Sequence, residues 1–119
     1  MADSSATFHE AEQHLTPLTR DMHRAIVSLM EELEAVDWYQ QRVDATQDTE
    51  LREILAHNRD EEKEHAAMVL EWIRRRDPGF SKVLRDYLFS EGRIVAREEA
   101  LERGENGRAA GLGSLRGVR

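Results

Sequence analysis

The sequence predicts an all-α protein, built as an antiparallel two-helix hairpin with short helices after it. Three observations support this fold class. Apolar residues recur at steps of three and four along two long segments, the chain holds only two prolines, and no alternating strand pattern occurs. At 119 residues, the chain can form one small domain with one small core.

The first long helix is expected to begin at about Thr19 and to end within residues 44–49. Pro17 stands just before it, where a missing amide proton costs least. The aspartates and threonines of residues 44–49 favour turns and caps. The helical pattern consists of apolar residues at steps of four, three, four and three: Met22, Ile26, Leu29, Leu33 and Val36.

The second long helix is expected to begin at Asp48 or Thr49 and to continue to about Arg76. Three consecutive arginines, the last at position 76, suit the negative carboxyl end of a helix dipole. The sequence Asp-Pro-Gly then predicts a stop. Shorter helices are expected after it, over residues 80–89 and 94–103.

The chain therefore divides into three predicted parts. Residues 1–18 form an N-terminal arm, and residues 19–103 form the helical hairpin domain with its short C-terminal helices. Residues 104–119 form a flexible tail that holds five of the seven glycines. Such a tail is either a frayed end or a peptide that docks on another protein.

A two-helix hairpin with one apolar stripe per helix buries too little surface to be stable alone. The simplest partner is a second copy related by two-fold symmetry. Two hairpins would then pair into a four-helix bundle, and the chain is expected to be a homo-oligomer.

Composition excludes several classes of function. The net charge of −7 argues against a general nucleic-acid-binding protein and is compatible with attracting cations. Without cysteine, the chain has no disulfides and no thiolate metal site. No apolar run is long enough to span a bilayer or to act as a secretory signal. We expect a cytoplasmic protein that binds neither nucleic acid nor membrane.

Polar residues interrupt the apolar seam of the second helix at its middle, at Asn58, Glu62 and His65. These positions should face a partner helix, where an unpaired carboxylate costs several kcal/mol. On the first helix, Glu32 lies at the rim of the apolar stripe, with Tyr39 two turns further on. Each helix thus brings a carboxylate to about the middle of the hairpin interior.

Carboxylate oxygens and an imidazole nitrogen at i, i+3 spacing are ligands expected for Fe(II), Mn(II) or Zn(II). The spacing alone is weak, because Glu-x-x-His arises often by chance in so acidic a chain. The alternative is a buried Glu–His pair that only fixes the register of the helices. In contrast, Asp60, Lys63 and Glu64 are expected to face water, and Met68 and Trp72 to lie in the core.

Di-iron carboxylate bundles use a Glu from each of two helices and Glu-x-x-His from each of the other two, so this chain encodes half of such a site. Residues 23–45 and 55–72 closely resemble the encapsulated ferritins, and the likeness continues through residues 87–92. The terminal sequence GLGSLRGVR is similar to peptides that load cargo into encapsulin shells.

The resemblance implies a ferritin-like four-helix bundle of two chains, with dimers assembled into an open ring, commonly a decamer. It implies a ferroxidase centre whose iron ligands are Glu32, Glu62 and His65 from both chains, with Tyr39 close by. It also implies a second, outer metal site at Glu31, Glu34 and Trp38.

The implied activity is oxidation of Fe(II) to Fe(III) by dioxygen at a di-iron centre, with calcium, zinc or manganese as ions that can replace iron. Residues 112–118 would bind the shell protein, so that the chain would act inside an encapsulin nanocompartment in the cytoplasm. Two alternatives remain: a helical dimeric interaction module, and a protein that binds a redox-silent divalent metal.

Overall fold

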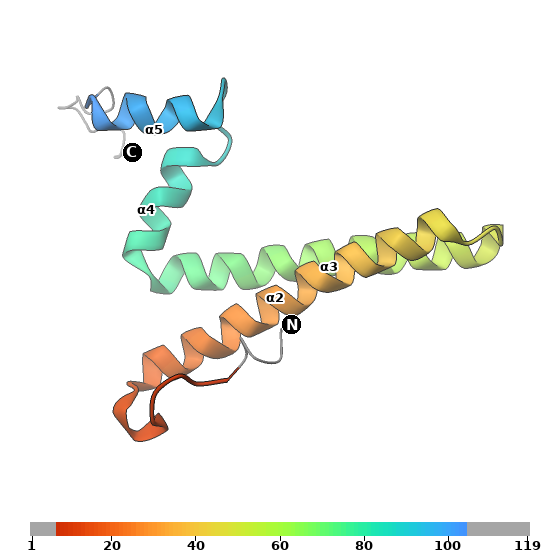
Figure 1. The fold of residues 1–119 in the computed structure, drawn as a ribbon, viewed down its shortest axis with the longest axis horizontal. Coiled ribbons are helices and arrows are strands. Elements are labelled where there is room, and N and C mark those ends of the chain that lie inside the picture. The colour runs from red at the N-terminus through yellow and green to blue at the C-terminus, as the bar shows by residue number, and fades with distance from the viewer. Residues whose placement is uncertain (1–6, 105–119) are drawn as a thin grey trace. The chain divides into compact units, whose positions relative to one another are not determined.

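The computed structural model describes residues 7–104, within two compact units that comprise residues 1–76 and 77–119. Among the described residues every regular element is helical and no strand occurs. The first unit contains the long helices, which lie side by side in opposite directions (Figure 1). The predicted all-α hairpin fold is confirmed.

The hairpin consists of α2 (Pro17–Ala45) and α3 (Thr49–Arg76), preceded by the short 3₁₀ helix η1 (Glu12–His14). Helix α2 begins two residues before the predicted start, because Thr16 acts as its N-cap. The Thr16 side chain accepts a hydrogen bond from the Thr19 amide at 3.0 Å, and Pro17 is the first helical residue.

The connection between the two helices is three residues long and held at both ends. Asp48 caps α3, since its side chain accepts a hydrogen bond from the Leu51 amide at 2.9 Å. The Arg52 guanidinium donates to the Val43 carbonyl at 3.3 Å and also to the Thr46 carbonyl. Arg52 thereby satisfies carbonyls that the end of α2 leaves without helical partners.

The second unit contains α4 (Pro78–Tyr87) and α5 (Ile94–Glu102). The Asp-Pro-Gly sequence ends α3 as predicted, but it also begins α4, so the helix expected over 80–89 lies two residues earlier. The reason is a cap: Asp77 accepts a hydrogen bond from the Phe80 amide at 2.9 Å. The last helix ends one residue before its predicted bound.

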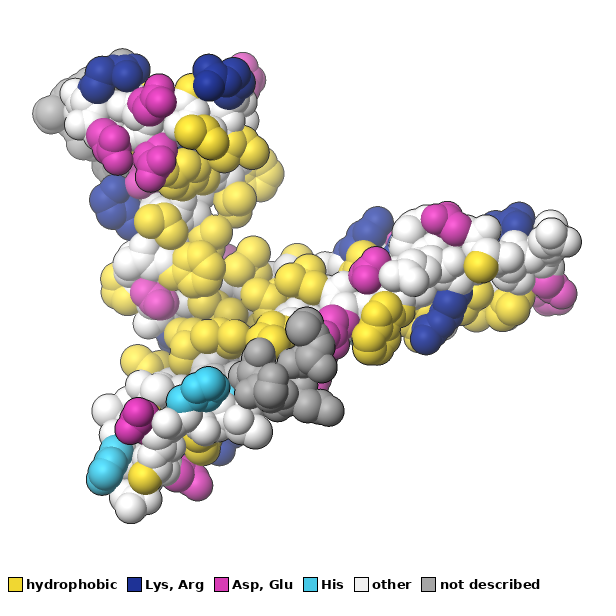
Figure 2. Space-filling model, viewed as in Figure 1, with side chains coloured by type: hydrophobic (Ala, Val, Ile, Leu, Met, Phe, Trp, Pro, Cys, Tyr) yellow, Lys and Arg dark blue, Asp and Glu magenta, His cyan; other side chains and the backbone are white. Residues whose placement is uncertain are grey.

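Apolar surface remains exposed on this second unit. Phe89 is fully exposed and has a φ of 62°, a left-handed conformation that is uncommon for a bulky residue. Ile94 and Val95 are also exposed, and on the face seen in Figure 2 hydrophobic side chains gather over α4 and the start of α5.

Very little of this chain is buried. Of residues 7–104, only Ala66, Ile73 and Ser81 are buried. The prediction that Met68 lies in the core is wrong, because Met68 is 59% exposed. Trp72 is half-buried, and the guanidinium carbon of Arg76 lies 4.3 Å from the centre of its ring. The spacing places Met68 on an apolar stripe that one hairpin cannot cover by itself.

No helix within residues 7–104 is both long and apolar enough to cross a membrane.

Candidate metal centre

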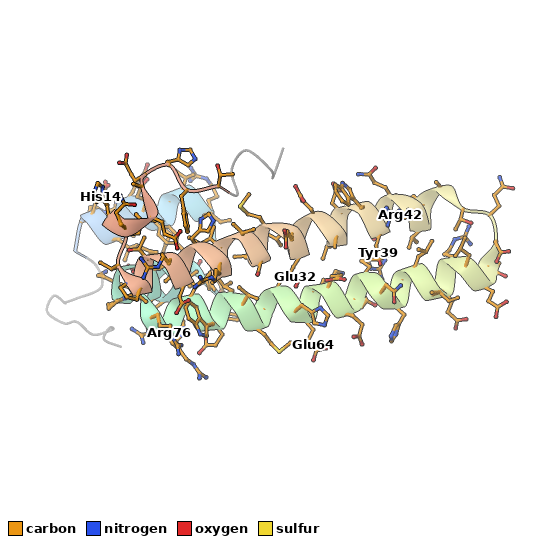
Figure 3. All side chains as sticks on the ribbon, turned by 90° about the horizontal axis from the view of Figure 1, so that it is seen from below. His14, Glu32, Tyr39, Arg42, Glu64 and Arg76 are labelled. Carbon is orange, nitrogen blue, oxygen red and sulfur yellow. The ribbon has the colours of Figure 1, made fainter. Side chains whose placement is uncertain are left out.

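The middle of the hairpin brings three ionisable side chains together. Glu32 comes from α2, and Glu62 and His65 come from one face of α3, where residues three apart are neighbours. In Figure 3, Glu32 lies on the side of α2 that is turned toward α3. The sequence prediction that these three residues meet is borne out by the geometry.

The three side chains are close enough to serve one cation. One ligand atom from each residue lies within 4.8 Å of the others. The Nδ1 atom of His65 is 3.4 Å from a Glu62 oxygen and 3.7 Å from a Glu32 oxygen. The side chains of Glu32 and Glu62 are 25% and 23% exposed and that of His65 is 41% exposed, so the cluster is partly open to solvent.

The neighbouring carboxyl group of Glu62 perturbs the pKa of Glu32. The pKa of Glu32 is raised above its ordinary value, first by its hydrogen bond with Glu62, then by burial and by the negative charge of Glu62. The charge and hydrogen bond of His65 act in the opposite direction and are smaller. A divalent cation bound by both carboxylates would offset the repulsion between their negative charges.

A cross-helix contact beside the cluster fixes the register of the hairpin. The Arg59 guanidinium donates to the Gln40 side-chain oxygen at 2.8 Å and to Asp60 at 2.9 Å, although only 20% of its side chain is exposed. Sequence reasoning did not single out Arg59, which lies three residues before Glu62 on the same helix. The sequence feature that could have identified Arg59 is its position next to Asn58, one of the polar residues that interrupt the apolar seam of α3.

Around the cluster, the other charged residues of α3 face water as predicted. Asp60 and Lys63 have exposed side chains, and Glu64 projects from the side of α3 that is turned away from α2 (Figure 3). Glu61 is exposed, and one of its carboxylate oxygens lies 3.6 Å from the Nε2 atom of His57. These groups do not join the cluster.

Tyr39 lies further along α2 than Glu32, by seven residues or about 10 Å of helix rise. Its side chain is half-buried, and the Arg42 guanidinium carbon lies 5.4 Å from the centre of its ring. Tyr39 is therefore on the same face as Glu32 without being part of the three-residue cluster. Its role near bound metal stays a prediction.

The residues of the outer site lie on a neighbouring face of α2. Glu31 is exposed, Glu34 is half-buried, and Trp38 is 52% exposed. Their spacing of three and four residues places them on one side of the helix. Ligation by these residues stays a prediction.

The donor set fits a hard or borderline divalent ion. Two carboxylate oxygens and one imidazole nitrogen suit Fe(II), Mn(II) or Zn(II), and nothing in the cluster is a soft thiolate ligand. Three side chains leave coordination positions of such an ion open. The hairpin thus carries a carboxylate–histidine cluster at the middle of a helix pair that buries very few of its own residues.

A helical hairpin with this cluster belongs to the class of ferritin-like carboxylate proteins, and comparison with known proteins assigns the family. The sequence pattern of the EncFtn-like family matches residues 7–91. This protein belongs to that family.

Individual relatives agree with the assignment. The chain is 57% identical to the encapsulated ferritin-like protein of Rhodospirillum rubrum, over 98% of this chain and 93% of the relative. It is 47% identical to the encapsulin nanocompartment cargo protein EncC of Myxococcus xanthus, over 40% of this chain and 36% of that one. A crystal structure of a Nitrosomonas europaea protein, 68% identical, superposes with a TM-score of 0.71 over 73% of this chain and 96% of that chain.

Replacing Glu32 with glutamine should stabilise the metal-free protein at neutral pH and weaken zinc binding. The folded-state pKa of Glu32 is raised, so ionising this group opposes folding at any pH above that value. This cost to the stability of the folded state is lost as the pH falls through the raised pKa, because Glu32 becomes protonated. The extra stability of the Glu32→Gln variant over wild type should therefore shrink at acidic pH.

Thermal unfolding at fixed protein concentration, across neutral to acidic pH, checks this. The exposed Glu64→Gln serves as the matched control and should change neither stability nor zinc affinity appreciably. Equal unfolding midpoints for Glu32→Gln and wild type at neutral pH would contradict the repulsion between the carboxylates.

Proposed function

We propose that the protein oxidises Fe(II) to Fe(III) with dioxygen at a di-iron centre formed between two copies of the chain. The observation that carries the proposal is the Glu32–Glu62–His65 cluster, which provides half of the ligands that a di-iron carboxylate bundle uses. Family membership and the near-absence of a core in the single hairpin support it.

Charge balance favours two divalent ions in the proposed centre, which is compatible with two Fe(II) ions as the substrate. Each half-site contributes two carboxylates and a histidine, so two half-sites supply four negative charges against the four positive charges of two divalent ions. A buried centre that is neutral overall avoids the large desolvation penalty of uncompensated charge. Anionic oxygen ligands also stabilise Fe(III) more than Fe(II), which favours loss of an electron.

The redox step balances with dioxygen as the oxidant. Each of two Fe(II) ions gives up one electron, and O2 accepts both electrons with two protons to give hydrogen peroxide and two Fe(III) ions. Holding both irons in one site lets a single O2 molecule take both electrons without a diffusional step. Glu32, Glu62 and His65 would hold the ions, and the half-buried Tyr39 lies two turns further along the same face of α2.

The proposed setting is an encapsulin nanocompartment. The R. rubrum relative is named as encapsulated and the M. xanthus relative as encapsulin cargo, and we extend this property to the present chain. Residues 112–118 are the proposed shell-binding segment; they lie outside the described residues. Dimers are proposed to assemble into a decameric ring, with the Fe(III) mineral stored by the surrounding shell in the cytoplasm.

Alanine at Glu62 or at His65 should reduce dioxygen-dependent Fe(II) oxidation to the rate of iron in buffer alone, because each dimer then loses two ligands. Anaerobic addition of Fe(II), followed by air, allows ferric absorbance and oxygen consumption to be recorded together. Glu64→Ala removes a similar charge from the solvent side of α3 and should keep the wild-type rate. Wild-type oxidation by both site variants would overturn the assignment.

The same experiment separates oxidation from silent metal binding. The protein could bind two Fe(II) ions per dimer without oxidising them faster than buffer alone does. In that case the redox-silent alternative is correct. Native mass recorded before and after Fe(II) addition shows whether a dimer forms and whether the metal promotes it.

Replacing Glu31 and Glu34 together with alanine should change the oxidation rate a few-fold while the dimer persists, as expected for an outer site that delivers ions. Glu50→Ala with Glu53→Ala removes two glutamates at the same spacing from α3 and should leave the rate unchanged. Loss of the dimer in the Glu31 and Glu34 variant would indicate a structural role instead.

Deleting residues 112–119 should abolish loading into the shell and leave Fe(II) oxidation intact, because the metal cluster lies wholly in the hairpin. Co-purification with the shell protein measures loading, and the free protein is assayed for oxidation. Undiminished encapsulation of the shortened chain would refute the shell-binding role of the tail.

A further inference from the structure

The guanidinium of Arg59 connects the two long helices between the metal cluster and the turn. It donates to the side-chain oxygen of Gln40 on α2 at 2.8 Å, and its Nε atom donates to Asp60 on α3 at 2.9 Å. Within residues 33–61, the contact with Gln40 is the only hydrogen bond that joins side chains of the two helices. Arg59 stands one turn before Glu62, which is about 4.5 Å of helix rise.

Both partners of Arg59 are themselves held in place. The Gln40 amide nitrogen donates to Asp44 at 2.9 Å, so the Gln40 oxygen is turned toward Arg59. On α3, the Lys63 ammonium lies 3.6 Å from the Asp60 carboxylate. The pKa of Asp60 is lowered, first by its hydrogen bond from Arg59, so Asp60 stays ionised at neutral pH. A planar guanidinium can donate to both partners at once, because its N–H groups point in fixed and different directions.

Buried apolar surface does little to hold this half of the hairpin together. The buried residues of the hairpin are Ala66 and Ile73, and both come after the cluster on α3. None of residues 33–61, which run from the cluster to the turn and back, is buried. The spacing of α2 and α3 in this half therefore depends strongly on the polar contacts between them.

The metal cluster is sensitive to this spacing. Glu62 and His65 are fixed relative to each other because they lie on one helix, whereas Glu32 comes from the other helix. Any shift of α2 against α3 moves Glu32 away from the other two side chains. Metal ions tolerate little of this, because metal–ligand distances in proteins stay within about 0.2 Å of their usual values.

We propose that Arg59 is a positioning residue of the metal centre, which through Gln40 holds α2 where Glu32 can meet the two ligands of α3. This inference rests on the proposed function, because it assigns Arg59 to the same site. Arg59 is not one of the three clustered side chains, so it acts only through the geometry of the ligands. Residues that orient metal ligands in this way commonly set metal affinity.

The alternative role for Arg59 is to stabilise the hairpin without affecting the metal site. Loss of the contact with Gln40 would then lower the unfolding temperature, and the folded protein would bind metal as before. A positioning role instead lowers the metal affinity of the folded protein. Metal affinity is therefore measured well below the unfolding midpoint, at fixed protein concentration, and the midpoint is recorded separately.

Zinc titration of the metal-free protein against a competing chelator tests the proposal. Gln40→Met and Arg59→Met should each lower zinc affinity by about tenfold, as is typical when a residue that orients metal ligands is removed. The double variant should lose no more than either single variant, because both substitutions break the same contact. Gln40→Met carries little risk to folding, since Gln40 is exposed.

Two further measurements distinguish positioning from stability. Gln40→Glu keeps an oxygen acceptor for Arg59 and should bind zinc about as tightly as wild type. Cobalt(II) provides a spectroscopic readout, because its visible absorption depends on the number and geometry of its ligands. The cobalt spectra of Gln40→Met and Arg59→Met should differ from that of wild type, since Glu32 is displaced.

The matched controls remove hydrogen bonds of the same kinds that lie within single helices. Gln41 donates within α2, to Asp37 at 3.2 Å. Arg75 donates within α3, to Glu71 at 2.7 Å. Gln41→Met and Arg75→Met should keep the wild-type zinc affinity and cobalt spectrum.

The outcomes separate this role of Arg59 from the proposed function. Wild-type zinc affinity and cobalt spectra in both Gln40→Met and Arg59→Met would overturn the positioning role, even if their unfolding midpoints fell. Equal losses in the controls, or additive losses in the double variant, would overturn it as well. If the contact variants lose zinc affinity but the wild-type protein does not accelerate Fe(II) oxidation, the positioning role stands and the proposed function fails.

Discussion

Two carboxylates within hydrogen-bonding range repel each other when both are ionised. This repulsion is the main physical constraint on the middle of the hairpin, where Glu32 and Glu62 meet. Glu32 and Glu62 meet because α2 and α3 are fixed in register by the short capped turn and by the contact between Arg59 and Gln40. The raised pKa of Glu32 expresses the strain in the metal-free state. A bound cation would attract both carboxylates instead. The arrangement that opposes folding of the metal-free chain would then favour folding of the metal-bound chain.

The same constraint accounts for how little of the chain is buried around the cluster. A hairpin that buried Glu32 and Glu62 completely would leave them without compensation, at a cost of several kcal/mol. The chain instead leaves the cluster partly open to solvent, and apolar residues before and after it on α3, such as Ile54 and Met68, remain exposed. In the proposed dimer, one second chain would both cover these apolar residues and complete the proposed metal site.

Helical periodicity predicted the hairpin and the meeting of Glu32, Glu62 and His65, because both follow from spacing along two regular helices. The helix ends were less accurate: Thr16 and Asp77 act as caps through single hydrogen bonds that periodicity does not record. Met68 was assigned to the core because a pattern identifies an apolar stripe without showing what covers it. Arg59 was missed because its importance lies in one cross-helix contact.

A centre divided between two identical chains also has a genetic consequence. In the proposed dimer each codon for a ligand is used twice, so one missense change alters both halves of the site. In a cell that makes normal and altered chains together, random pairing would place an altered chain in many of the dimers that contain a normal one. If Glu32, Glu62 and His65 form the proposed half-site, an altered chain that still folds and pairs would also impair the dimers that it forms with normal chains.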